Sequence, residues 1–257
     1  MEIYSKYMFD YSKERGKHPM TPTKTQSNSM MKQGIKAGFP IVIGYLPVAI
    51  TFGVLAKQTG LSLFELTSMS IFVYAGASQF MAVNMIGLGV SATEIILATF
   101  ILNFRHFVMS FSFMNQLRMI PLRVKVPLTL GLTDETFAVS SMYTEEAKKE
   151  KGDIFYLTLL ITAYLSWIGG SFLGGLLGNI IPEKLSQSMG IALYAMFIGL
   201  IIPPIKKELK LGLIALVAMI TNTICSEVFL LSSGWSIVIG TIIGGLSGVF
   251  IQKEGNI

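Results

Sequence analysis

Charged residues are scarce in this chain. Asp, Glu, Lys and Arg make up 14% of its 257 residues, whereas an average soluble domain carries roughly 25%. Hydrophobic residues make up 52%, and the mean hydropathy is +0.61. The apolar character begins near Gly38 and persists to about Phe250. This composition predicts an integral membrane protein rather than a soluble domain joined to an anchor.

The usual motifs of soluble enzymes and metal sites are also missing. The single cysteine, Cys225, excludes an intramolecular disulfide, and its apolar surroundings favour a small core residue over a reactive thiol. There is no Walker A sequence, no H-E-x-x-H motif and no paired Cys/His spacing. We therefore expect no enzymatic activity, no cofactor and no metal. The net charge of +5 does not indicate nucleic-acid binding, because the basic residues lie in a tail and in short loops.

Polar tails flank the apolar region. Residues 1–36 contain seven Lys or Arg and three acids, and they lack the early apolar stretch of a secretory signal. We interpret them as a basic, mostly disordered cytoplasmic tail, and residues 252–257 as a short polar C-terminal tail. Met30 and Met31 offer an alternative translation start.

Residues 37–251 are predicted to form a single polytopic transmembrane domain of the all-α class. A helix needs about 20 apolar residues to cross a bilayer. Six segments are long enough: 38–57, 65–88, 92–114, 154–178, 187–205 and 209–231. Segment 235–251 is short, and segment 124–143 holds Asp134 and Glu135 in its middle. The predicted number of transmembrane helices is therefore seven or eight.

The distribution of Lys and Arg favours an eight-span topology with both termini inside. One group argues against it, because Arg118, Arg123 and Lys125 would then lie outside. If segment 124–143 enters the membrane and returns, everything after it inverts. The sequence leaves both topologies open.

An internal repeat is indicated by matches at a nearly constant offset. Ser68–Ala75 and Ser188–Ala195 share five of eight residues at an offset of 120. Two further matches occur in the same order along both halves at an offset of nearly 120: Tyr45-Leu46 with Tyr164-Leu165, and Asn103 with Asn222. The predicted three-helix repeats cover 38–114 and 154–231, and secondary transporters often bind substrate between such repeats. The repeats are parallel if segment 124–143 spans the membrane, and inverted if it does not.

Polar residues inside the apolar segments are the candidates for substrate binding or proton coupling, because a charge at the bilayer centre costs roughly 2.5–3.5 kcal/mol. They are Gly76, Gln79, Asn103, Arg105, His106, Asp134, Glu135, Asn222 and Glu227. Arg105 cannot deprotonate, and we predict that it pairs with Asp134 or Glu135. In the functional hypothesis Arg105 binds a substrate carboxylate while a carboxylate or His106 carries a proton. Alternatively, the pair only fixes helix register, or Arg105 reaches the membrane edge.

Two groups of glycines each allow two structural interpretations. Gly76-Ala77-Ser78-Gln79 interrupts the second span, which permits either local unwinding beside a ligand or a tight helix contact. Glycines at four-residue spacing favour either packing within the chain or a subunit interface. They are Gly170, Gly174 and Gly178, and Gly240, Gly244 and Gly248. For Glu227 the alternative is a position near a membrane face.

Three motifs resemble those of the AzlC-type branched-chain amino acid permease family, the large subunit of a two-component exporter. They are Tyr74-Ala75-Gly76-Ala77-Ser78-Gln79-Phe80, Asn103-Phe104-Arg105-His106 and Thr133-Asp134-Glu135-Thr136-Phe137. The resemblance covers about 38–205. It implies export of branched-chain amino acids across the cytoplasmic membrane of a prokaryote, driven by proton motive force. It also implies a small hydrophobic AzlD-type membrane subunit as a partner.

The first functional hypothesis is therefore a secondary exporter of valine, leucine, isoleucine or similar amino acids. Arg105 suits the carboxylate of a zwitterion, and Asp134 or Glu135 suits its ammonium group. Three aromatic residues suit a branched side chain: Phe80, Phe104 and Phe137. A channel for small solutes and a non-transporting membrane scaffold for a partner protein remain as alternatives.

Overall fold

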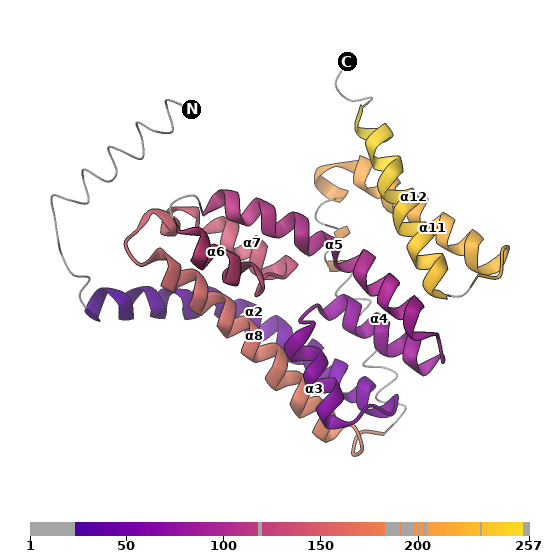
Figure 1. Ribbon diagram of the computed structural model, residues 1–257, viewed down its shortest axis with the longest axis horizontal. Coiled ribbons are helices and arrows are strands. Elements are labelled where there is room, and N and C mark those ends of the chain that lie inside the picture. The colour runs from indigo at the N-terminus through magenta and orange to yellow at the C-terminus, as the bar shows by residue number, and fades with distance from the viewer. Residues whose placement is uncertain are drawn as a thin grey trace.

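The structure is a computed structural model, and all its regular elements among the described residues are helices (Figure 1). The described residues are 24–117, 120–182, 191, 198–199, 201–202, 205–231 and 233–253. Five helices within these residues are long and apolar enough to cross a membrane. Most of the predicted span 187–205, and with it most of the repeat match at Ser188–Ala195, lies outside the described residues.

Two long helices, α2 (Lys24–Gln58) and α8 (Gly152–Leu177), lie side by side along most of their lengths (Figure 1). Helix α2 therefore includes residues 24–36 of the segment interpreted as a tail. Gly38 lies against Leu159, and Gly53 lies against Ser171. Because the residue numbers rise together along the contact, the two helices are parallel. We call the end where both begin the near end, and the end where both finish the far end.

Small residues make this close contact possible. A Cβ atom at Gly174 would lie 2.0 Å from the carbonyl oxygen of Ile50, and one at Gly53 would lie 2.1 Å from that of Ser171. Helices in lipid associate through such close packing, because burial of apolar surface gives them little advantage. Gly170, Gly174 and Gly178 thus pack against α2, and Gly240, Gly244 and Gly248 pack against α11.

The second predicted span, 65–88, does not cross as one helix. It is split into α3 (Leu63–Phe72) and α4 (Gly76–Gly87), with a break at Val73–Ala75. Tyr74 has a φ of 43°, a left-handed conformation that is rare for a residue with a side chain. The expected local interruption near Gly76 is confirmed, whereas the single span is wrong.

The two helices form a re-entrant hairpin, which we call hairpin 1. It starts at the far end, where Leu66 lies beside Gly175. The break reaches the middle of α8, where α4 begins beside Trp167. Helix α4 then runs back, and its last residue, Gly87, lies beside Thr59 just after α2. The chain therefore enters from the far end and returns to it.

Helix α5 (Ala92–Gln116) then crosses in the direction opposite to α2 and α8. It starts after hairpin 1 at the far end. Towards its finish Phe113 packs edge-to-face on Tyr156 near the start of α8, with ring centroids 5.7 Å apart. Helix α5 therefore ends at the near end.

A second broken segment follows, which we call hairpin 2. It consists of α6 (Leu122–Thr129) and α7 (Asp134–Met142), and so segment 124–143 is not a continuous span. It starts at the near end, where the Lys125 ammonium donates to the Met114 carbonyl oxygen at 3.3 Å. Hairpin 2 thus begins beside the end of α5.

Hairpin 2 also returns to the end from which it came. Its break reaches the middle of α2, where Thr133 bonds to Tyr45. Near the end of α7, Ser141 bonds to the Gln116 amide at 3.2 Å, back at the last turn of α5. A 3-10 helix, η1 (Thr144–Lys148), then leads into α8.

The two hairpins resolve the conflict in the charge distribution. Because each returns, α2 and α8 keep the same direction although segment 124–143 does not cross. Arg123 and Lys125 therefore lie at the near end, together with the lysines that precede α8. The positive-inside rule assigns this basic near end to the cytoplasm.

The last two helices form an antiparallel pair, α11 (Leu209–Glu227) and α12 (Ser233–Lys253), drawn in orange and yellow in Figure 1. Helix α12 joins the rest of the protein near the far end. Its Val238 packs with Ala98 of α5 and Met85 of α4 in a small buried cluster.

The re-entrant arrangement predicts which sites share a membrane face. In a background with Cys225→Ser, single cysteines at Gln58 and Thr93 flank hairpin 1, whereas cysteines at Arg123 and Glu150 lie at the start of hairpin 2 and after its end. A membrane-impermeant maleimide should label the first pair from outside intact cells and the second pair only after permeabilisation. If positions 58 and 93 label from opposite sides, hairpin 1 crosses the membrane and the arrangement is wrong.

Candidate functional site

The breaks of the two hairpins meet in a small polar pocket between α2, α5 and α8. Its lining residues are Tyr45, Tyr74, Ala75, Gly76, Ala77, Arg105, His106, Thr133, Asp134, Glu135 and Trp167. Both α4 and α7 begin at this pocket. Five of the predicted candidates line it, from three separate segments: Gly76, Arg105, His106, Asp134 and Glu135.

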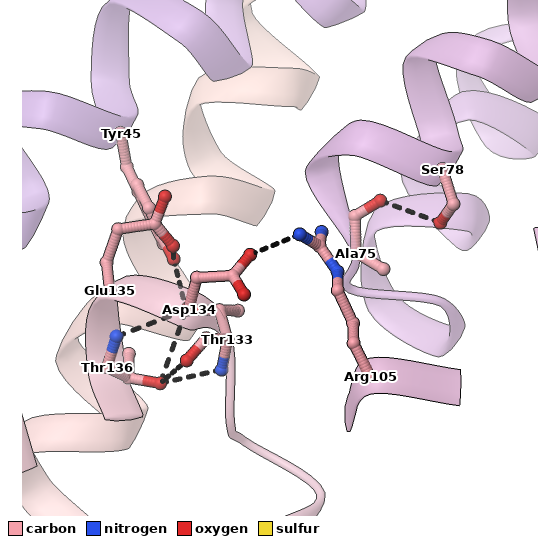
Figure 2. Close-up of polar contacts among 8 residues, drawn as sticks. All are labelled: Tyr45, Ala75, Ser78, Arg105, Thr133, Asp134, Glu135 and Thr136. Atoms are coloured by element: carbon pink, nitrogen blue, oxygen red, sulfur yellow. Dashed lines mark hydrogen bonds and ion pairs between the residues drawn. The ribbon is translucent and has the colours of Figure 1, made fainter. Parts of the chain in front are cut away.

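An ion pair connects α5 to the tip of hairpin 2. The Nη1 atom of Arg105 lies 2.7 Å from Oδ2 of Asp134 (Figure 2). The two side chains are 33% and 27% exposed. The predicted pairing of Arg105 is thus confirmed, with Asp134 as the partner. Within the described part of the chain, the buried Nε of Arg105 has no hydrogen-bond partner.

The start of α7 is capped by its own side chains. The Thr133 hydroxyl accepts from the Thr136 amide, and the Thr136 hydroxyl accepts from the Thr133 amide at 2.7 Å. This capping box satisfies amides that a helix start otherwise leaves without partners. Figure 2 shows this network below the two acidic side chains.

Glu135 is held by α2 rather than by a basic residue. The Tyr45 hydroxyl donates to Oε2 of Glu135 at 2.7 Å and also bonds to the Thr133 hydroxyl. Among the described residues, no Lys or Arg lies within ion-pair distance of Glu135. A carboxylate at this depth without a cation is available to a positively charged ligand group or to a proton.

Gln79 is placed behind the pocket lining. Its side chain is fully buried, and its Oε1 atom accepts from the Trp167 indole at 3.0 Å and from the Ala75 amide at 3.2 Å. Its Nε2 atom donates to the Ser70 hydroxyl at 3.0 Å. Gln79 therefore bonds α3, the break and α8 together, which gives it a positioning role for the candidate site.

Three large residues of the pocket were not predicted as site residues: Tyr45, Tyr74 and Trp167. Trp167 packs edge-to-face on Tyr45, with centroids 5.3 Å apart. In the sequence, Tyr45 is marked only by its match with Tyr164 in the predicted repeat. The chain has two tryptophans, and an indole N–H within an apolar span needs an acceptor. That requirement was the available signal for Trp167.

The remaining candidates lie elsewhere. Asn103 is on α5 outside the pocket lining, and Asn222 packs against Gly240 of α12. The side-chain oxygens of both asparagines are buried without partners among the described residues. Glu227 is exposed at the end of α11. The described residues contain no group of three His, Cys, Asp or Glu placed to hold a metal.

The expected aromatic wall is not formed. Phe80 is buried against Phe52, with centroids 5.5 Å apart. Phe104 is 56% exposed on the outer surface of α5, and Phe137 packs against the core on the first turns of α7. None of the three residues predicted to contact a branched side chain lines the pocket.

Comparisons with known proteins identify the matching family. The family model described as AzlC protein matches residues 40–181, a range that holds both hairpins and every pocket residue. No solved structure matches the chain.

Several curated relatives are membrane proteins. An uncharacterized membrane protein of Archaeoglobus fulgidus is 35% identical over 181 residues, which are 70% of this chain and 78% of that one. Inner membrane protein YgaZ of Escherichia coli is 27% identical, with 74% and 80% covered. The branched-chain amino acid transport protein AzlC of Bacillus subtilis is 26% identical, with 75% and 76% covered.

The hydrogen bonds of Gln79 predict a large cost for its removal. Gln79→Leu leaves the Trp167 indole and the Ala75 amide buried without acceptors, at roughly 1–3 kcal/mol for each group. The thermal stability of the detergent-solubilised protein should fall clearly. Asn84→Leu is a matched control, because Asn84 is exposed on the same helix. An equal effect of the two substitutions contradicts the role assigned to Gln79.

Proposed function

The chain belongs to the AzlC family of multi-pass membrane proteins, and from that premise we propose that it is a secondary transporter. Its substrates are branched-chain amino acids such as valine, leucine and isoleucine, which it exports across the cytoplasmic membrane of a prokaryote. The name of the Bacillus subtilis relative supports this substrate class. The residues of the pocket support it independently.

The observation that carries the proposal is a pocket of mixed charge between two broken helices. Arg105 supplies positive charge, while Asp134 and Glu135 supply negative charge. An amino acid zwitterion has one group of each sign, and burying either group without a partner is costly. Glu135 is the acceptor for the substrate ammonium group, because Asp134 is already paired with Arg105.

The pocket is narrow in this structure. It has room for roughly one water molecule, so an amino acid enters only when a hairpin moves. Hairpin 1 closes the pocket from the far end, and hairpin 2 closes it from the near end. Alternate movement of the two hairpins exposes the pocket to one side of the membrane at a time, as secondary transport requires.

Export against a gradient needs an energy source, and we assign it to proton motive force. Glu135, Asp134 and His106 lie in one pocket, and each of these side chain types can bind and release a proton. Proton binding to a carboxylate would compete with the substrate ammonium group. That competition gives a physical route for coupling.

We propose eight membrane-inserted segments in total. Five are the candidate spans of the structure, two are the hairpins, and the eighth is the predicted span 187–205, most of which lies outside the described residues. The first helices of the two proposed repeats, α2 and α8, are parallel and face each other at nearly the offset of the sequence matches. A small AzlD-type membrane subunit is the proposed partner.

Counterflow of radiolabelled isoleucine in proteoliposomes tests the proposed function, with the chain co-expressed with its small partner. Wild-type protein should show saturable exchange. Glu135→Gln keeps the size of the side chain but removes its charge, and should reduce exchange at least tenfold. Glu145→Gln is the matched control, because Glu145 pairs with Lys148 on the surface, and its exchange should equal that of wild type.

The outcomes separate transport from the other functions. Uptake that does not saturate and shows no exchange indicates a channel. Absence of flux for every branched-chain amino acid, with intact assembly of the partner, indicates a scaffold. Normal exchange by Glu135→Gln contradicts the assignment of Glu135.

The ion pair requires a separate test, because it has a purely structural alternative. Arg105→Asp combined with Asp134→Arg restores opposite charges and should recover thermal stability lost in each single variant. Exchange of isoleucine should remain below a tenth of wild type, because the charges facing the substrate are reversed. Recovery of both stability and exchange shows that the pair only fixes the register of α5 and α7.

A further inference from the structure

The starts of the two pocket helices differ in how their amides are satisfied. Helix α7 has its capping box, whereas no side chain in the described part of the chain caps the first turn of α4. The first three residues of α4 are Gly76, Ala77 and Ser78, and amides at these positions have no partner within a helix. Gly76 and Ala77 line the pocket. An uncapped helix start carries partial positive charge, which favours an anion.

The helix start is held in place without using these donors. Gln79 accepts from the Ala75 amide behind the break, and the Ser78 hydroxyl donates back to the Ala75 carbonyl oxygen at 2.9 Å (Figure 2). Neither bond engages the first-turn amides. The local fold therefore fixes the direction of α4 while its amides stay open towards the pocket.

A second and independent observation comes from Tyr74. Its side chain is 5% exposed and lines the pocket. Its hydroxyl is buried without a hydrogen-bond partner among the described residues. A buried hydroxyl normally finds a partner, and the rare left-handed backbone of Tyr74 is a conformation that concentrates at functional sites. The hydroxyl, whose polar neighbours include Tyr45 and Glu135, is thus available as a donor to a ligand in the pocket.

The charges around the pocket orient a zwitterion. The α7 side carries two carboxylates, Asp134 and Glu135, whereas the α4 side carries only donors. Arg105 lies between them, with its Nη1 engaged by Asp134 (Figure 2). Because Arg105 and Asp134 neutralise each other, direct contacts to a substrate carboxylate fall to other groups.

We propose that the start of α4 and the Tyr74 hydroxyl form the carboxylate subsite for the transported amino acid. The first-turn amides and the Tyr74 hydroxyl donate to the carboxylate, and the ammonium group points towards Glu135. This inference rests on the proposed function and adds the orientation of the substrate. It moves the carboxylate from Arg105, where the sequence placed it, to a helix start.

Tyr74→Phe tests the subsite, because it removes one oxygen atom that has no hydrogen-bond partner among the described residues. The half-saturating isoleucine concentration in counterflow should rise about tenfold, as expected for one hydrogen bond to a charged group. Isoleucinamide keeps the ammonium group but lacks the carboxylate. Its inhibition constant against isoleucine exchange should change less than about twofold.

Tyr164→Phe is the matched control. The Tyr164 ring packs edge-to-face on Tyr74 with centroids 4.9 Å apart, but its hydroxyl donates to the Ile71 carbonyl oxygen. This substitution should leave the preference for isoleucine over isoleucinamide unchanged. If Tyr74→Phe binds both ligands like wild type, or weakens both equally, the subsite is wrong although transport stands. If wild-type protein exchanges no branched-chain amino acid, both proposals fail.

Ala75→Asp tests the helix start with a variant that should raise thermal stability while it lowers transport. Ala75 is the cap residue of α4 and lines the pocket, so an aspartate there can bond to the first-turn amides as the substrate carboxylate would. The variant should gain thermal stability and lose isoleucine exchange. Ala75→Val is the size control and should gain no stability. Reduced stability of Ala75→Asp, or unchanged exchange, contradicts an anion site at this helix start.

Discussion

The requirement that backbone polar groups be satisfied away from water governs this structure. A helix that ends in the middle of a bilayer leaves amides and carbonyls without partners, which lipid cannot supply. Two such ends are tolerated here because the close-packed helices α2 and α8 lie against both of them. The glycine contacts bring those helices together. Trp167 of α8 then bonds to Gln79 beside the first break, and Tyr45 of α2 bonds to Thr133 at the second. The pocket exists only because this support is present.

The polar pocket and its support divide the work between residues of similar type. Gln79 and Thr136 form their hydrogen bonds within the chain, and these bonds fix where α4 and α7 begin. Glu135 and Tyr74 can still bind a ligand, because among the described residues the Glu135 carboxylate has no cation beside it and the Tyr74 hydroxyl has no hydrogen-bond partner. Sequence position alone does not separate these roles, because Gln79 and Tyr74 belong to one short motif.

The sequence predicted the class of protein, several spans and the pairing of Arg105, because composition and the cost of a buried charge act locally. It did not predict that 65–88 doubles back. A run of apolar residues reads the same whether the chain crosses or returns, and only contacts such as Gly87 with Thr59 decide between them. The bond from Gln79 to Trp167 joins residues 88 positions apart, so no local pattern announces it. The indole of Trp167 indicates that an acceptor is needed, but not that Gln79 is that acceptor.

The dependence of hairpin 1 on α8 has a consequence for biosynthesis. Residues 63–87 leave the ribosome well before α8 does, yet Ser171 and Trp167 of α8 supply their buried hydrogen bonds. Until α8 arrives, the uncovered break is poorly suited to lipid. The nascent hairpin must therefore wait at the membrane surface or inside the insertion machinery, and it takes its final position only after later helices have entered. Assembly of this protein is thus non-sequential: its second apolar segment is completed by its fifth.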